Sequence, residues 1–178
     1  MESALATLIL MIALLFTILT FADTYFTTED QLWQAQSMME EQAALRETTA
    51  LEFVESSVTG GTGTLVEFTF RNVGSSKLAN FAQWDLIVQH YSAAGMYSVQ
   101  WLPYVTGSVP GNNQWAVVGL YLSAAAGTPE VYEPGILNAG EEIVIQAKVQ
   151  PPIGPNTTNL ATLMTDTGYQ QSALFVRP

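Results

Sequence analysis

The chain has 178 residues, enough for one domain with a sizeable core and an appendage. Five Lys and Arg residues against sixteen Asp and Glu residues give a net charge of −11, which opposes binding to nucleic acid or to an anionic membrane surface. The absence of cysteine excludes a disulfide scaffold, a thiol nucleophile and a thiolate metal site.

The N-terminal segment is strongly apolar. Residues 3–22 carry no charge and are dominated by Leu, Ile, Ala, Met and Phe, over about the length of a bilayer-spanning helix. The first basic residue is Arg46, so the basic flank of a secretory signal or signal anchor is missing. We therefore expect that a basic leader is removed ahead of Met1, which would make Met1 the start of a processed chain.

The helical pattern continues beyond the apolar run. Residues 23–55 contain no Gly or Pro and are rich in Gln, Glu, Ala, Met and Leu, so one helix is predicted from about residue 2 to about residue 55. Its second half carries an apolar stripe that would face a core or a partner helix. The adjacent β-branched residues Thr27 and Thr28 predict a possible bend. The helical region is assigned to residues 1–57, with residues 1–22 as its hydrophobic polymerisation or membrane segment.

An all-β domain is predicted over residues 58–178. The glycine-rich stretch at 60–63 marks the boundary, after which the periodicity becomes alternating. In the clearest strand, Ile143, Ile145 and Ala147 share one face, whereas Glu142 and its outward neighbours face solvent. Turn residues separate the predicted strands, which span 66–71, 85–91, 97–101, 115–122, 142–149 and 173–176. The pattern predicts an α+β chain: a long N-terminal helix, then an antiparallel immunoglobulin-like β-sandwich.

Two short motifs accompany this architecture. The first is Asn72-Val73-Gly74 at the end of a strand, and the second is Leu137-Asn138-Ala139-Gly140-Glu141 before the next-to-last predicted strand. Together with the helix-then-sandwich order, they resemble the type IV pilin-like superfamily, and archaellins and archaellum stator domains in particular. Bacterial type IV pilins usually carry Glu at the fifth position of the mature chain and often a C-terminal cysteine pair, whereas this chain has Leu5 and no cysteine. These differences favour the archaellin side.

The resemblance implies a non-enzymatic structural subunit of an extracellular swimming filament. Its partners would be copies of itself, the membrane before assembly, the archaellum or pilus assembly machinery and a leader peptidase. A helix this apolar must lie in lipid or in a bundle of like helices, so the segment is expected to form the filament core. The expected core residues are Leu5, Leu8, Ile9, Ile12, Leu15, Phe16 and Leu19. A non-rotating adhesion pilus subunit and a membrane-anchored, stator-like protein that binds an envelope partner remain alternatives.

Two residues are candidates for special roles in such a filament. Glu2 is the only charge near the front of the apolar run and could pair with an α-amino group in the core; the alternative is a solvated carboxylate favoured by the helix dipole. Asn156 begins an Asn-Thr-Thr glycosylation sequon in a loop with Pro and Gly.

Catalytic and cofactor sites are not indicated. No nucleotide-binding, nucleophile-elbow or metalloprotease fingerprint occurs. The single histidine, His90, has no second imidazole or thiol to complete a zinc site and is interpreted as structural. The carboxylates follow no calcium-loop pattern, so neither metal nor cofactor is predicted. An aromatic set could line a sugar-binding face, although cores and interfaces use the same residues. This set comprises Trp101, Tyr104, Trp115 and Tyr121.

Overall fold

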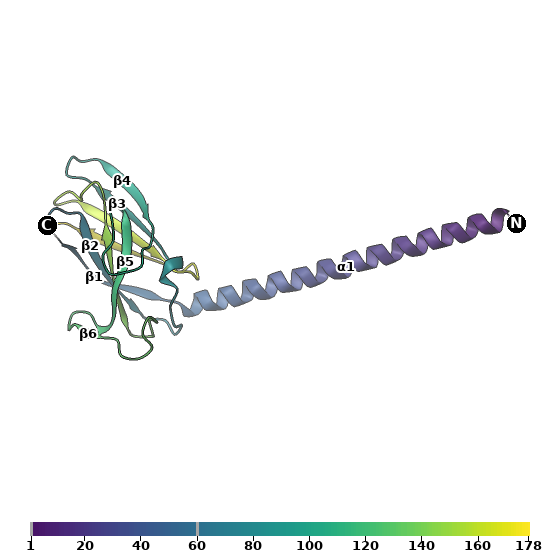
Figure 1. Ribbon diagram of the computed structural model, residues 1–178, viewed down its shortest axis with the longest axis horizontal. Coiled ribbons are helices and arrows are strands. Elements are labelled where there is room, and N and C mark those ends of the chain that lie inside the picture. Colours follow the sequence, from purple (N-terminus) through teal and green to yellow (C-terminus); the bar gives the residue numbers. More distant parts are fainter. Residues whose placement is uncertain (1, 60) are drawn as a thin grey trace. The chain divides into compact units, whose positions relative to one another are not determined.

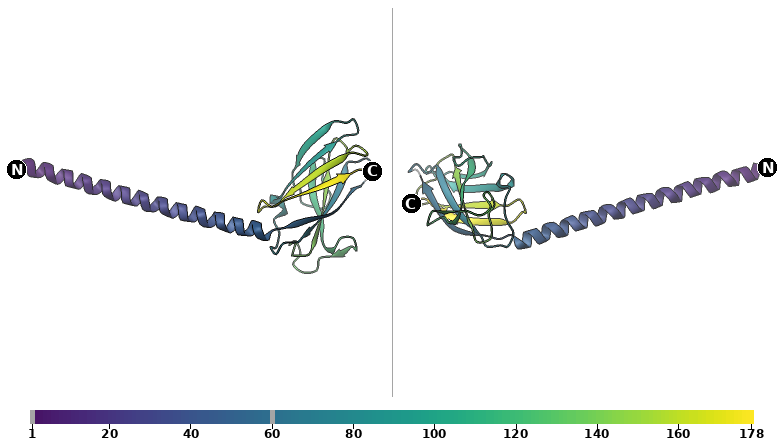
Figure 2. Two further views of the ribbon diagram at one scale, coloured as in Figure 1. Left: turned by 180° about the vertical axis from the view of Figure 1, so that it is seen from behind. Right: turned by 60° about the horizontal axis from the view of Figure 1, so that its bottom comes forward.

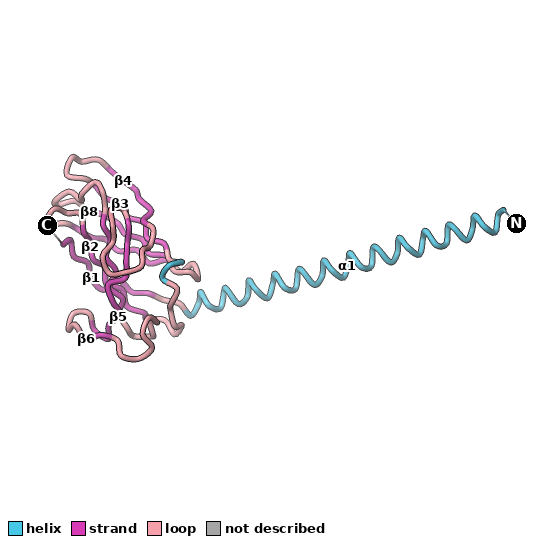
Figure 3. The backbone as a smooth tube through the Cα atoms, viewed as in Figure 1, coloured by secondary structure: helices cyan, strands magenta, loops and turns pink. Residues whose placement is uncertain are grey.

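The computed structural model of the chain describes residues 2–59 and 61–178, with side chains described from residue 6 onward (Figure 1). One helix comes first, and strands and loops make up nearly all the rest (Figure 3). The chain divides into two compact units, one up to Ala44 and the other Leu45–Pro178. The second unit contains the last turn of the helix together with the whole β domain.

The helix α1 spans Glu2–Thr48 and is continuous through Thr27 and Thr28, so the possible bend there does not occur. It ends earlier than the predicted helical region of residues 1–57, because Leu51–Thr59 forms strand β1. This strand pairs antiparallel with β2, from Leu51 opposite Asn72 to Thr59 opposite Leu65. Pairing in a sheet outweighs the weak helix preference of a segment that contains aromatic and β-branched residues.

The β domain is an antiparallel sandwich of two sheets, as the sequence predicts (Figure 2). One sheet has the strand order β1-β2-β7-β5-β6 and the other β4-β3-β8-β9, and all strand pairs are antiparallel. After β1, the strands are β2 Leu65–Asn72, β3 Asp85–Tyr91, β4 Tyr97–Leu102, β5 Gln114–Ser123, β6 Thr128–Pro129, β7 Glu142–Lys148, β8 Thr158–Met164 and β9 Gln170–Val176, with a 3-10 turn at Phe81–Gln83. Strands β1, β6 and β8 are not among those predicted from the sequence.

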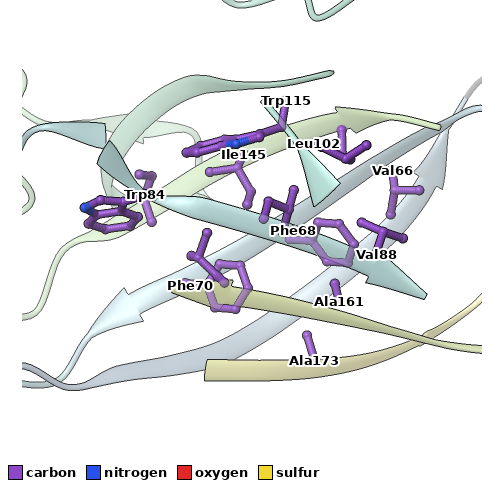
Figure 4. Close-up of a cluster of buried hydrophobic side chains, with 14 of the residues drawn as sticks. Val66, Phe68, Phe70, Trp84, Val88, Leu102, Trp115, Ile145, Ala161 and Ala173 are labelled. Atoms are coloured by element: carbon purple, nitrogen blue, oxygen red, sulfur yellow. The ribbon is translucent and has the colours of Figure 1, made fainter. Parts of the chain in front are cut away.

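The core lies between the two sheets, where alternate residues of each strand point inward. Phe68 and Ile145 come from one sheet and Val88 from the other, and all three are fully buried (Figure 4). Phe68 also makes an edge-to-face contact with Phe175 of β9, with ring centroids 5.2 Å apart. Burying one such side chain stabilises the fold by about 1.5–3 kcal/mol, so these inward residues account for the alternation seen in the sequence.

Glu142 departs from the predicted pattern. Its side chain points to the outer surface of its sheet, but it is only 5% exposed because neighbouring groups cover it. Arg71 Nη2 donates to Glu142 Oε1 at 2.6 Å, and the backbone N–H of Ala124 donates to Oε2 at 2.7 Å. Burial by itself would raise the pKa of Glu142, but the hydrogen bond from Ala124 and the Arg71 guanidinium outweigh it and lower the pKa below its ordinary value.

Candidate polymerisation helix and its junction with the sandwich

The apolar part of α1 is exposed along its described length. The predicted core residues Leu8, Ile9, Ile12, Leu15, Phe16 and Leu19 all lie on it with their side chains exposed; Phe16, for example, is 71% exposed. The predicted core residue Leu5 and the candidate charge Glu2 have side chains outside the described ones. None of these predicted residues takes part in the core of the sandwich.

The apolar side chains of this helix point outward in all directions around its axis. Residues 8–12 are five consecutive apolar residues, which cover more than one full turn of about 3.6 residues. A helix that is apolar all round requires an apolar environment on all sides. By length and composition, the helix Ala6–Thr48 includes a stretch that could cross a membrane.

The threonines of α1 suit such an environment. Thr17 Oγ1 donates to the Ala13 carbonyl at 2.8 Å, and Thr24 Oγ1 donates to the Thr20 carbonyl at 2.8 Å. Thr28 makes the same bond to the Thr24 carbonyl at 2.7 Å. These hydroxyls are satisfied by the helix backbone itself, so they carry little cost when water is excluded.

The C-terminal end of α1 is capped by a loop of the β domain. The Thr48 carbonyl accepts the backbone N–H groups of Ser75 and Ser76 at 3.0 and 3.2 Å. The hydroxyls of Thr48 and Ser76 are also hydrogen-bonded, at 2.6 Å. Carbonyls in the last turn of a helix lack partners within the helix, and this loop supplies them for Thr48.

A second loop holds the same turn through Arg46. Its Nε and Nη2 atoms donate to the Gly168 carbonyl at 3.1 and 2.6 Å. Gly168 lies in the turn between β8 and β9, far from Arg46 in the sequence. Two separate loops of the sandwich therefore fix the last helical turn, residues 45–48, to the β domain.

The two sequence motifs meet at this junction. The Asn72 side chain donates to the carbonyls of Ser76 and Leu137 at 2.8 and 3.1 Å and accepts the backbone N–H of Gly74 at 3.0 Å. The Asn72 backbone also bonds to the second motif. Its N–H donates to the Glu141 carbonyl at 2.9 Å, and its carbonyl accepts the N–H of Gly140 at 2.7 Å. The motifs thus support the capping loop, a role that their sequence alone does not indicate.

The remaining residues considered in the sequence, Asn156 and His90, form no common site. Asn156 is exposed, and the neighbouring hydroxyl of Thr157 donates to the Gly154 carbonyl at 2.8 Å. His90 is fully buried, with Nε2 2.8 Å from the Pro151 carbonyl oxygen. In the described part of the chain, no group of three or more His, Asp or Glu side chains is arranged to hold a metal ion.

The four aromatic residues do not form one sugar-binding face. Trp115 is fully buried in the core, where its ring meets Tyr104 edge-on with centroids 4.9 Å apart. Trp101 is instead exposed on the outer surface of β4. Trp115 thus lies inside the sandwich and Trp101 on its outside, so the set cannot act as one stacking platform.

Comparison with known proteins identifies the fold through solved structures. No family model matches the chain, and no curated protein matches its sequence. The archaeal flagellum of Methanospirillum hungatei strain JF1 aligns over 97% of this chain and 92% of its own, with a TM-score of 0.55 and 10% identity. The archaeal flagellin FlaB1 from Methanocaldococcus jannaschii aligns over 73% and 90%, with a TM-score of 0.51 and 10% identity.

A stator domain is also similar. The archaellum periplasmic stator protein FlaG from Sulfolobus acidocaldarius aligns over 71% of this chain and 99% of its own, with a TM-score of 0.50 and 20% identity. At these identities the likeness concerns the fold. The chain thus shares its fold, a long N-terminal helix followed by an antiparallel β-sandwich, with the Methanospirillum hungatei flagellum, and 71% of its length aligns with the fold of FlaG.

Proposed function

We propose that this chain is the structural subunit of an extracellular helical filament of the archaellum type, in which the N-terminal apolar helix forms the core. The observation that carries the proposal is the helix itself: its described apolar side chains are exposed all round the helix, and none belongs to the core cluster of the sandwich. Such a surface is stable only in lipid or against other apolar helices.

Assembly from a single kind of subunit follows from the same feature. Before assembly the helix would lie in the membrane, and in the filament the helices of neighbouring copies would replace the lipid. Contacts between unlike surfaces of identical chains generate an open helical array when the rotation does not close. The proposed core residues are Leu5, Leu8, Ile9, Ile12, Leu15, Phe16 and Leu19.

Further roles follow from this assignment. Glu2 would pair with an α-amino group within the filament core, where an unpaired charge would be costly. The sandwich would form the outer surface, with Asn156 as a glycosylation site. The subunit's other partners would be its assembly machinery and a leader peptidase.

The likeness to FlaG favours one second candidate, a stator-like protein. In that role the helix would stay in the membrane and the sandwich would bind an envelope partner. The alignment with the Methanospirillum hungatei flagellum extends over nearly the whole chain, helix included, which favours the filament subunit.

The test is electron microscopy of filaments sheared from the cell surface, with mass spectrometry of their protein and its N-terminus. We expect long filaments made of this chain. Recovery only in the membrane fraction would overturn the filament role in favour of the stator-like one. Loss of swimming in a deletion strain would then separate a propeller from an adhesion pilus.

A further inference from the structure

The outer surface of the four-stranded sheet is unusual for so acidic a chain. Its large exposed apolar and aromatic side chains come from β3, β4 and β9; Trp101 and Leu174, for example, are 60% and 66% exposed. We call this surface the uncharged face and define it by Tyr91, Tyr97, Val99, Trp101, Leu174 and Val176.

The pairing of the strands brings these residues together. Tyr97 lies opposite Tyr91 with ring centroids 5.1 Å apart, and Val99 lies opposite Gln89 of β3. Across β8, Leu160 connects Gln89 to Leu174 of β9. One largely uncharged surface, in which neutral polar side chains such as Gln89 lie between the apolar ones, therefore continues over β4, β3, β8 and β9.

Charge is almost absent from this surface. Among its described outward-facing residues only Asp85 is charged, and its Oδ1 accepts the indole N–H of Trp101 at 2.7 Å. The outer surface of the other sheet is different. It carries Glu52, Glu67, Arg71, Glu142 and Lys148.

The aromatic side chains are also held in place. Tyr97 donates its hydroxyl hydrogen to Gln89 Oε1 at 2.7 Å, as Trp101 donates to Asp85. These lateral bonds orient the rings along the sheet before any partner arrives. Preorganised side chains lose less conformational entropy on binding, which favours a contact surface over an incidental patch.

From this surface we infer that the uncharged face is the contact between the sandwich domains of neighbouring copies of this chain. The inference rests on the proposed filament function. Each copy carries a net charge of −11, so a copy packs most favourably against its neighbour with the surface that carries the fewest carboxylates.

The size of the face points to the same occupant. Four strands of about seven residues, spaced about 4.8 Å apart with a rise of about 3.3 Å, cover roughly 450 Å². Together with the opposing area on the neighbouring copy, the contact buries roughly 900 Å², below the roughly 1,200–2,000 Å² of stable complexes between free proteins. Copies already held together by their helices meet at a high effective concentration, so a contact of this size suffices between them.

Single cysteines test the inference in the full chain, because the natural sequence contains none. Val99→Cys places a thiol on the uncharged face, and Val54→Cys places one on β1, where Val54 is also an exposed valine of a strand. Maleimide labelling is compared between assembled filaments and the same chain dispersed in detergent. We expect assembly to slow labelling at position 99 about tenfold and to leave position 54 unchanged.

Other outcomes are equally decisive. Equal labelling of Val99→Cys in filaments and in detergent overturns the inference and leaves the filament proposal standing. Protection of both positions to the same degree overturns the assignment to this face. If Val99→Cys is protected from labelling on intact cells but not in purified filaments, the face contacts an envelope partner, and the inference of a contact between copies is overturned. If no filament contains the chain, the proposed function itself fails.

A charge substitution gives a second measurement. Val99→Lys introduces an unpaired charge into the inferred contact, so its filaments should dissociate at a lower temperature than those of Val54→Lys. Equal near-ultraviolet circular dichroism of both variants in detergent verifies that both fold. Equal dissociation temperatures would contradict the inference.

Discussion

Asn72 is a buried polar residue whose side chain is fully used. It makes hydrogen bonds with the carbonyls of Ser76 and Leu137 and with the backbone N–H of Gly74. An asparagine at the end of a strand is a common turn signal in a sequence. Only the structure shows that this one links both motifs to the loop that caps α1.

Replacing Asn72 with Ala should destabilise the β domain by about 2–3 kcal/mol, because buried backbone groups lose their partners. Thermal unfolding of the full chain in mild detergent, followed by near-ultraviolet circular dichroism, measures the effect. Asn112→Ala is the matched control, since Asn112 is exposed in a turn. A midpoint for Asn72→Ala equal to that of the control would show that the hydrogen bonds of Asn72 add no stability.

Two glutamates should respond to pH in opposite directions. The pKa of Glu142 is lowered, so its contribution to stability should be present at neutral pH and lost as pH falls below about 4.5 and through the folded value. For Glu130, burial first and then the charge of Glu141 raise the pKa, so ionisation of Glu130 opposes folding at neutral pH.

The variants Glu142→Gln and Glu130→Gln separate the two effects. Glu142→Gln should lower the thermal midpoint at pH 7 and reduce the difference between the midpoints at pH 7 and pH 3. Glu130→Gln should give a midpoint at pH 7 equal to or higher than that of the natural chain. Thermal midpoints measured at pH 7 and pH 3 provide the comparison. A Glu142→Gln protein that keeps the full acid sensitivity of the natural chain would refute the assignment.

At the scale of elements, the last turn of α1 depends on the close approach of the capping-loop backbone at Gly74 to the backbone of Thr48. A Cβ atom added at Gly74 would lie 2.4 Å from the Thr48 carbonyl oxygen, a backbone atom that cannot move without shifting the turn. The glycine of the Asn-x-Gly motif is therefore required by the fit between the capping loop and the helix end.

Gly74→Ala should cost about 1–3 kcal/mol, as expected for overpacking against a rigid neighbour. Gly111→Ala is the control, because the added Cβ would meet only the flexible end of the Gln114 side chain. Thermal unfolding in detergent should give a lower midpoint for Gly74→Ala than for Gly111→Ala. The opposite order would mean that the loop adjusts without cost.

At the scale of the whole molecule, the two units would have separate tasks in the proposed filament. The core residues of the sandwich all lie between Leu51 and Phe175, and the apolar residues of α1 contribute none of them. A change in the apolar segment should therefore affect assembly without affecting the fold of the β domain.

Ile12→Asp tests this separation, because a carboxylate in an apolar helix bundle is strongly unfavourable. We expect filaments to be absent, while the near-ultraviolet circular dichroism of the β domain stays unchanged. Val109→Asp, at a loop residue that is 80% exposed, introduces the same charge and should still assemble. Normal filaments from Ile12→Asp would contradict a polymerising role for the helix.

The sequence by itself determined the apolar helix, the absence of cysteine and the strands whose alternation is strong, because these properties depend on local composition and periodicity. Only the tertiary structure decided where α1 ends, because residues 51–59 form a strand that pairs with β2. It also decided that Thr158–Met164 is a central strand and that Asn72, Gly74 and Arg46 act together at the helix end. Those outcomes depend on contacts between residues far apart in the chain, which local patterns do not encode.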